Sequence, residues 1–239
     1  MAMKKAHVNQ VKLLADLITM VQGDLSRPMR QKIGCMITMD AHSRDIIEQL
    51  HNEKVTNSEE FQWQSQLKVY YIDDDKTNPF ILKIADAVFN YGYEYLGNGP
   101  RLVITPLTDR IYVTATQALH LCMGCAPAGP AGTGKTETTK DLSSALAKAI
   151  YVFNCSDQMD FKSMAGIFKG LAASGSWGCF DEFNRLVPEV LSVCSVQFKS
   201  VTDAIKAKKS RFKIEGDEMD LDPHLRCFHY HESRLSWSC

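Results

Sequence analysis

The sequence predicts an α/β fold built on a parallel sheet, with a smaller α+β segment in front of it. Two observations predict this class. From residue 109 onward, short apolar segments alternate with patterns of helical period, which is typical of parallel strands joined by crossover helices. Residues 129–136 lie between a predicted strand and a predicted helix and are rich in glycine, which is typical of a tight turn between two such elements.

The first part of the chain combines helical and strand patterns. Residues 5–22 place apolar side chains on one helical face, and Gly23 ends that pattern. A second helix is predicted for residues 28–50 and a short one for residues 58–63. The remaining predicted elements of this part are a strand over 67–72, a polar loop over 73–79 and a strand over 80–88.

The second part begins with a predicted helix over residues 109–121, for which Thr108 or Asp109 would be the N-cap. The apolar run 119–125 predicts the strand in front of the glycine-rich loop, and a helix follows that loop. The later predicted elements are a strand over 149–155, a helix from 161 that Gly175 closes, a strand over 177–182, a helix over 187–208 and a hairpin around Gly216.

The glycine-rich segment fits the phosphate-binding pattern G-x-x-x-x-G-K-[ST]. Its glycines allow backbone N–H groups to surround a phosphate, Lys135 can reach the β- and γ-phosphates, and the Thr136 hydroxyl can bind Mg²⁺. The positive end of the following helix faces the same anion. The candidate ATP-binding residues are therefore Gly129, Pro130, Ala131, Gly132, Thr133, Gly134, Lys135 and Thr136.

A second motif, Trp177-Gly178-Cys179-Phe180-Asp181-Glu182, is an apolar strand that ends in two carboxylates. In a P-loop ATPase, Asp181 would hold Mg²⁺ together with Thr136, and Glu182 would activate the attacking water as a general base. Asn154 ends the preceding strand with a polar side chain. It either restrains the catalytic glutamate, as in several AAA+ proteins, or satisfies the backbone of its own loop.

Longer stretches around these motifs resemble one family. The segments RLVITPLTDR (101–110), GPAGTGKTETTKDL (129–142), VFNCSD (152–157) and GCFDEFNR (178–185) resemble the first AAA+ module of dynein heavy chains. The forms GKTETTKDL and VFNCSD resemble axonemal chains, and residues 2–25 resemble outer-arm beta-type chains. The resemblance covers residues 1 to about 222.

This resemblance implies a domain organisation and a function. Residues 1–95 would be the C-terminal part of the dynein linker, 96–222 the beginning of the first AAA+ module, and 223–239 a divergent tail. Ile104 and Leu107 would border the adenine of ATP. The parent protein would be an ATP-driven microtubule motor of the ciliary or flagellar axoneme, with dynein intermediate and light chains as partners and ATP and Mg²⁺ as ligands.

The C-terminal residues depart from the family pattern. After Asp222 the pattern calls for an apolar strand ending in asparagine, between the phosphate-loop strand and the Asp181-Glu182 strand, but the chain reads PHLRCFHYHESRLSWSC. The sequence therefore predicts an incomplete AAA+ module with two unpaired strand edges. This leaves an alternative function open, that of a truncated nucleotide-binding or inactive fragment.

The composition of the chain disfavours several other classes of protein. Lys and Arg number 27 against 28 Asp and Glu, so no nucleic-acid partner is indicated, and no apolar run is long enough to span a bilayer. Helicases and transporters are thus disfavoured among P-loop proteins. The eight cysteines, without a secretory signal, predict reduced thiols. Cys122 and Cys125 are expected to be buried strand residues rather than half of a zinc site.

Overall fold

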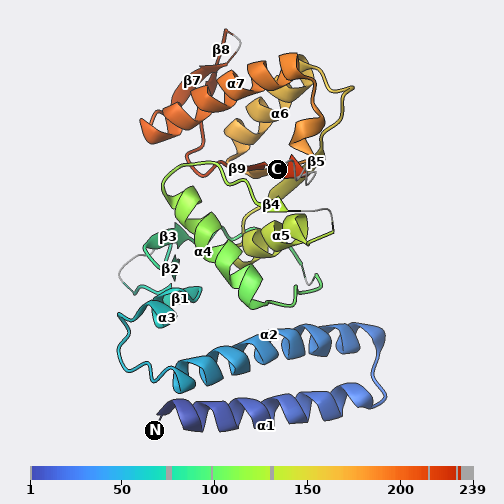
Figure 1. The fold of residues 1–239 in the computed structure, drawn as a ribbon, viewed down its shortest axis with the longest axis vertical. Coiled ribbons are helices and arrows are strands. Elements are labelled where there is room, and N and C mark those ends of the chain that lie inside the picture. The colour runs from blue at the N-terminus through green and yellow to red at the C-terminus, as the bar shows by residue number, and fades with distance from the viewer. Residues whose placement is uncertain are drawn as a thin grey trace, which may run out of the picture. The chain divides into compact units, whose positions relative to one another are not determined.

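The computed structural model describes residues 2–73, 77–97, 99–129, 132–214, 216–229 and 231–232. The chain divides into two compact units, one formed by Met1–Asn90 with Tyr95–Val113 and the other by Tyr91–Glu94 with Thr114–Cys239. Figure 1 shows their elements along the chain. None of the helices in the described residues is both long and apolar enough to cross a bilayer.

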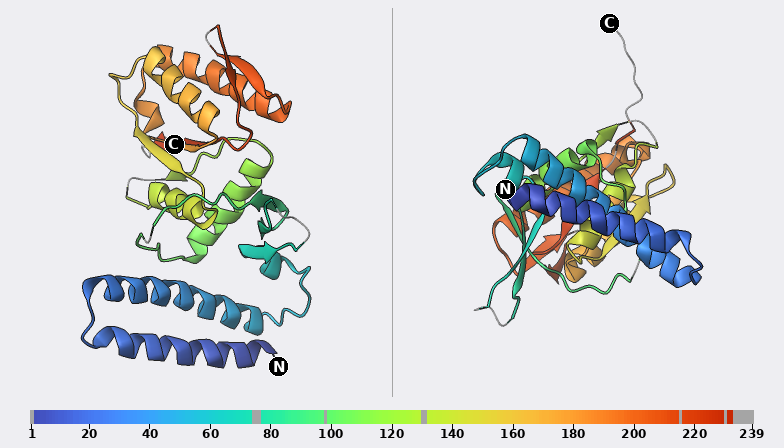
Figure 2. Two further views of the ribbon diagram at one scale, coloured as in Figure 1. Left: turned by 180° about the vertical axis from the view of Figure 1, so that it is seen from behind. Right: turned by 90° about the horizontal axis from the view of Figure 1, so that it is seen from below.

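The first unit begins with a pair of long helices, as the helical patterns predicted. Helices α1 (Ala2–Gln22) and α2 (Arg27–Asn52) run side by side in opposite directions (Figures 1 and 2). Leu14 and Leu17 of α1 and Ile33 of α2 are buried, so each helix covers the apolar face of the other. The short helix α3 (Phe61–Gln64) follows.

A small antiparallel sheet follows the helices, in the order β1-β2-β3. Its strands are β1 (Lys68–Tyr71), β2 (Phe80–Ile84) and β3 (Ala87–Asn90). The single strand predicted over 80–88 is wrong, because the chain turns back at Ala85, whose φ is +47°. A turn of two residues lets β3 pair with β2 in register from Ile84 opposite Ala87. The buried positions change from even-numbered (Leu82 and Ile84) to odd-numbered (Ala87) across this turn, and Val88, which the single strand would have turned inward, is exposed.

Helix α4 (Pro106–His120) begins earlier than predicted. Its N-cap is Thr105, not Thr108 or Asp109: the Thr105 N–H donates to Thr108 Oγ1 at 2.6 Å, and the Thr108 N–H donates to Thr105 Oγ1 at 3.4 Å. This reciprocal pair is a capping box, and Pro106 occupies the first helical position, where its missing N–H costs nothing.

The strand predicted over 119–125 is also wrong at its start. Leu119 and His120 still belong to α4, and the backbone then reverses at Cys122, whose φ is +54°. The strand pairing in front of the glycine-rich loop begins with a parallel bridge at Cys125 and continues as β4 (Ala128–Gly129). An apolar run alone does not separate a buried helix end from a strand.

The second unit is built on parallel strands. Strands β5 (Ile150–Asn154), β6 (Trp177–Asp181) and β9 (Arg226–His229) form a sheet in the order β5-β6-β9. Phe228 of β9 bridges Cys125 in parallel, and β10 (His231–Glu232) pairs in parallel with β4. The C-terminal segment therefore lies between β6 and the strand that leads into the glycine-rich loop.

This arrangement corrects the expectation of a missing strand. β9 lies where the sequence predicted two unpaired strand edges, and it pairs with β6 from Trp177 opposite Arg226 to Phe180 opposite His229. Phe228 is 1 % exposed, and its ring centroid lies 5.4 Å from that of Trp177. The strand was not predicted because its first and last residues are polar, whereas its two central residues, Cys227 and Phe228, are apolar and buried.

Helices cover both faces of these strands. Helix α5 (Lys135–Ala145) lies on one side, and α6 (Phe161–Ser174) and α7 (Pro188–Lys206) lie on the other (Figures 1 and 2). The 3-10 turn η1 (Phe183–Arg185) follows β6, and the hairpin of β7 (Arg211–Ile214) and β8 (Asp217–Asp220) follows α7. Helix α6 ends at Gly175, as predicted.

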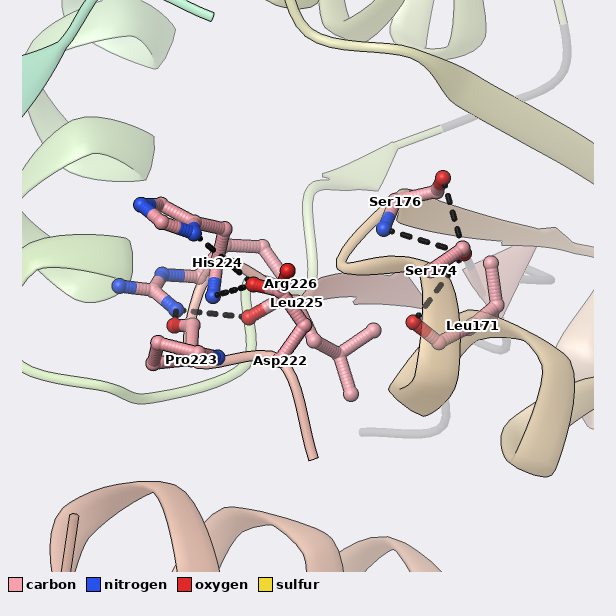
Figure 3. A network of polar contacts seen from close by, with 8 residues as sticks. All are labelled: Leu171, Ser174, Ser176, Asp222, Pro223, His224, Leu225 and Arg226. Atoms are coloured by element: carbon pink, nitrogen blue, oxygen red, sulfur yellow. Dashed lines mark hydrogen bonds and ion pairs between the residues drawn. The ribbon is translucent and has the colours of Figure 1, made fainter. Parts of the chain in front are cut away.

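A network of polar contacts fixes the start of β9 (Figure 3). The Asp222 carboxylate accepts hydrogen bonds from the His224 N–H and ring Nδ1, both at 2.8 Å. The Asp222 N–H donates to the Ala172 carbonyl of α6 at 2.9 Å. Arg226 donates through Nε to the Leu119 carbonyl at the end of α4, at 3.0 Å. The segment that leads into β9 is thus bonded to α6 through Asp222, and the first residue of β9 is bonded to α4 through Arg226.

We expect Phe228→Ala to destabilise the second unit strongly, because it would remove a buried ring from the centre of the sheet. Large aromatic-to-alanine changes in cores cost about 3–5 kcal/mol. Phe161→Ala is the matched control, since Phe161 is 44 % exposed at the start of α6. Urea unfolding followed by tryptophan fluorescence measures both. Equal losses in the two variants would contradict the central position of β9.

Candidate nucleotide-binding site

The glycine-rich loop connects β4 to α5 and carries two left-handed glycines. Gly132 and Gly134 both have φ of +76°, a conformation that other residues adopt only at a cost in strain. Gly134 is the N-cap of α5, so the N–H groups of the first turn of α5 are directed toward the loop. Pro130 and Ala131 lie outside the described residues.

Two side chains at the end of the loop motif make hydrogen bonds, one to the backbone of the loop itself and one to the end of β6. Lys135 Nζ donates to the Gly129 carbonyl at 2.8 Å, which places the ammonium group at the loop. Thr136 Oγ1 donates to Asp181 Oδ2 at 3.0 Å. Thr136 is the second residue of α5 and Asp181 ends β6, so this bond joins the two sequence motifs across 45 residues of chain.

Glu182 follows β6 in an unusual backbone conformation. Its φ of +52° and ψ of +39° are left-handed, and such a conformation in a residue other than glycine costs about 1–3 kcal/mol. Its N–H donates to Asp181 Oδ1 at 3.1 Å. Its Oε1 accepts a hydrogen bond from an Arg185 guanidinium nitrogen at 2.8 Å. Strained backbone of this kind gathers at functional sites.

The contact of Arg185 with Glu182 was not expected from the sequence. The signal was present, because Arg185 is three residues after Glu182 and a single turn brings such residues together. An arginine after a pair of carboxylates is common on protein surfaces, however, and the turn itself was not predicted.

An open cavity of about 480 Å³ joins these groups, a volume within the range of small-molecule sites. Asn154 of β5 lines it and pairs in register with Asp181 of β6. The two interpretations of Asn154 therefore both stay open. The residues that line the cavity are Gly132, Thr133, Gly134, Lys135, Thr136, Glu137, Lys140, Val152, Asn154, Asp181 and Glu182.

Two predicted site residues belong to the other compact unit. Ile104 is partly buried and Leu107 is 62 % exposed, and both lie within Tyr95–Val113. Their contact with adenine stays a prediction.

Cys125, Cys155, Cys179, Cys194 and Cys227 of the second unit are buried. Cys122 is only partly buried and lies in the turn after α4, so the expectation of a buried strand residue is wrong for Cys122, whereas Cys125 is buried and forms a strand bridge. Burial raises the pKa of the Cys125 thiol to about 11 and that of Cys227 to about 12, so both stay protonated and unreactive near neutral pH. Among the described residues, no three His, Cys, Asp or Glu side chains gather as a metal site would require.

The whole pattern matches a known family. A sequence family described as "Hydrolytic ATP binding site of dynein motor region" matches residues 91–234, more than half of the chain. The chain belongs to the dynein heavy chain family. The match runs past Asp222 through β9 and β10, so the expectation that the resemblance ends near that residue is corrected.

Curated dynein heavy chains are similar along most of this chain. The dynein alpha chain of the flagellar outer arm from Chlamydomonas reinhardtii is 64 % identical over 207 residues, which is 87 % of this chain and 4 % of that protein. Human dynein axonemal heavy chain 9 is 56 % identical over 227 residues, 95 % of this chain and 5 % of that protein. This dynein chain thus spans a small fraction of the length of these relatives.

The ciliary dynein beta chain of Tripneustes gratilla is 55 % identical over the same number of residues, 227. Among solved structures, the Thermotoga maritima RuvB Holliday junction branch migration motor is similar with a TM-score of 0.38 and 20 % identity, over 54 % of this chain and 39 % of that one. A similarity of that size has no bearing on function.

The residues present fit a nucleoside triphosphate. The left-handed glycines leave open space on the side where a Cβ would stand, and the ammonium group of Lys135 lies at the same loop. Backbone N–H groups of a glycine-rich loop, a helix N-terminus and a cation together form an anion site. This dynein site is therefore a nucleotide-binding site, in agreement with the family description.

We expect Lys135→Ala to weaken ATP binding about ten- to a hundredfold, because a charge-assisted hydrogen bond to phosphate contributes about 1.5–3 kcal/mol. Lys162→Ala, which changes an exposed lysine on α6 outside the cavity, is the control and should bind as tightly as the original chain. Titration with a fluorescent ATP analogue measures both. Equal affinities in all three proteins would contradict the assignment of the loop.

Proposed function

We propose that this chain carries the ATP-binding and ATP-hydrolysing site of an axonemal dynein heavy chain. The observation that supports the proposal most is the hydrogen bond from Thr136 Oγ1 to Asp181 Oδ2, with Glu182 next in the chain. This bond places two oxygens suited to Mg²⁺ beside the loop for the phosphates and one residue from a candidate base. All of these residues line one cavity.

Each residue has a role in this proposal. The loop N–H groups and Lys135 bind the phosphates, while the Thr136 hydroxyl and the Asp181 carboxylate hold Mg²⁺. When bound, Mg²⁺ supplies positive charge that neutralises the phosphate oxygens during transfer. Glu182 orients the attacking water and accepts its proton, and the ordered backbone around Glu182 holds that carboxylate at the edge of the cavity.

The parent protein extends the proposal. Residues 1–95 form the C-terminal part of the linker, and residues from 96 onward begin the first AAA+ module, with Ile104 and Leu107 beside the adenine. The motor acts on microtubules in the axoneme of cilia or flagella, and dynein intermediate and light chains are its partners. The names of the relatives, which include flagellar outer-arm and ciliary chains, support this location.

The alternative function is that of a nucleotide-binding fragment without hydrolysis. It depended in part on a missing strand between the phosphate loop and the carboxylates, and β9 lies in that place. With β9 present, β6, which precedes Glu182, and the segment that leads into the loop of Lys135 both pair with the same C-terminal segment. A measurement of hydrolysis decides between the two functions.

We expect Glu182→Gln to keep ATP binding and to slow hydrolysis by about 10²–10⁴-fold, because an amide does not accept the proton of water. Asp181→Asn should instead weaken binding only when Mg²⁺ is present. Glu189→Gln, at an exposed glutamate of α7, is the matched control. The measurement is single-turnover phosphate release, with the chain in excess over labelled Mg-ATP.

The outcomes separate the functions. If the unaltered chain hydrolyses ATP and both Lys135→Ala and Glu182→Gln abolish this activity, the proposed hydrolytic function is supported. Tight binding of Mg-ATP without any hydrolysis by the unaltered chain would favour the nucleotide-binding alternative. Normal hydrolysis by Glu182→Gln would remove Glu182 from the role of base.

A further inference from the structure

A continuous chain of hydrogen bonds runs from the phosphate loop to the protein surface. Thr136 Oγ1 donates to one oxygen of Asp181, and the other oxygen of Asp181 accepts the N–H of Glu182. The carboxylate of Glu182 then accepts from Arg185 at 2.8 Å. Arg185 is the outermost of these four residues and the one to which the proposed function assigns no role.

The turn between Glu182 and Arg185 is closed twice. The Arg185 N–H donates to the Glu182 carbonyl at 2.8 Å, and the Arg185 guanidinium donates to Glu182 Oε1 at the same distance. The backbone of Glu182 is held in its left-handed conformation at one end by Asp181. Main chain and side chain of Glu182 are therefore both fixed by neighbours in sequence.

The guanidinium approaches Glu182 from outside the cavity. Glu182 lines the cavity and its side chain is 28 % exposed, whereas Arg185 is not among the lining residues and is 57 % exposed. Oε1 is engaged by Arg185, which leaves Oε2 as the oxygen that can accept a proton. An arginine in this place holds the base without occupying the space of the substrate.

Fixing one oxygen matters because a glutamate side chain is flexible. Burying or ordering such a side chain costs conformational entropy, and a base that moves freely spends little time in line with the water. A misplacement of about 1 Å can reduce a rate about a hundredfold. A contact on the far oxygen restricts the carboxylate before substrate binds.

We propose that Arg185 is a positioning residue that orients the Glu182 carboxylate for proton acceptance in ATP hydrolysis. The inference rests on the proposed function of the same site. Exposed ion pairs contribute little to folding stability, so Arg185 serves the placement of Glu182 rather than the stability of the fold.

The test compares variants in the single-turnover assay and in ATP binding. Arg185→Ala should slow hydrolysis about ten- to a hundredfold and leave the affinity for the ATP analogue within about twofold. Arg185→Lys keeps a positively charged hydrogen-bond donor at this position and should therefore retain part of the hydrolysis rate that Arg185→Ala loses. In a Glu182→Gln background, Arg185→Ala should cause no further loss, because the group that it orients is already absent.

Arg211→Ala is the matched control. Arg211 is also 57 % exposed and also pairs with a carboxylate, that of Asp220 at 3.2 Å, but it lies on the β7–β8 hairpin. This variant should hydrolyse ATP at the original rate. Thermal unfolding of all variants checks that the fold is retained.

The remaining outcomes overturn the inference. An unchanged or faster rate in Arg185→Ala would show that the arginine does not orient the base. A loss of rate matched by a loss of affinity or of stability, or an added loss in the Glu182→Gln background, would show a structural role. No hydrolysis by the unaltered chain would remove the proposed function and this inference together, whereas hydrolysis that is insensitive to Arg185 removes the inference alone.

Discussion

The position of β9 is the constraint on which the nucleotide site depends. Neighbouring strands of a sheet lie about 4.8 Å apart, so a strand inserted between β6 and the strand of the phosphate loop sets their separation at about 10 Å. Parallel strands present their carboxyl ends at one edge, and it is there that the loop and the two carboxylates meet. The bond between Thr136 and Asp181 follows from that spacing.

The dynein site combines a rigid strand with strained backbone at its end. All but the last residue of β6 are buried, and the ring centroid of Phe180 lies 5.3 Å from that of Phe168 in α6. Packed rings of this kind resist displacement, since any movement of β6 would open a void. The left-handed conformation of Glu182 requires support, which the side chain of Asp181 and the turn to Arg185 supply. The same local bonds connect a candidate Mg²⁺ ligand to the candidate base.

The sequence by itself determined the elements whose signals are local. The phosphate-loop pattern, the apolar strand before Asp181, the helix closed by Gly175 and the long helix after Glu182 are recognised from residue types and spacing within a few turns of chain. The N-cap of α4 at Thr105 was predicted three or four residues too late, and the turn at Ala85 was not predicted at all, because caps and two-residue turns depend on single side chains and dihedral angles.

Only the tertiary structure decided the place of β9 and the role of its flanking residues. Four residues that include Arg226 and His229 do not form a strand by their own preference; they do so because strands on both sides satisfy their backbone groups. Arg226 reaches a carbonyl 107 residues away in sequence, a contact that no local pattern encodes. The short sequence motifs thus determine which chemical groups the nucleotide site contains, whereas contacts between distant parts of the chain determine how those groups are placed.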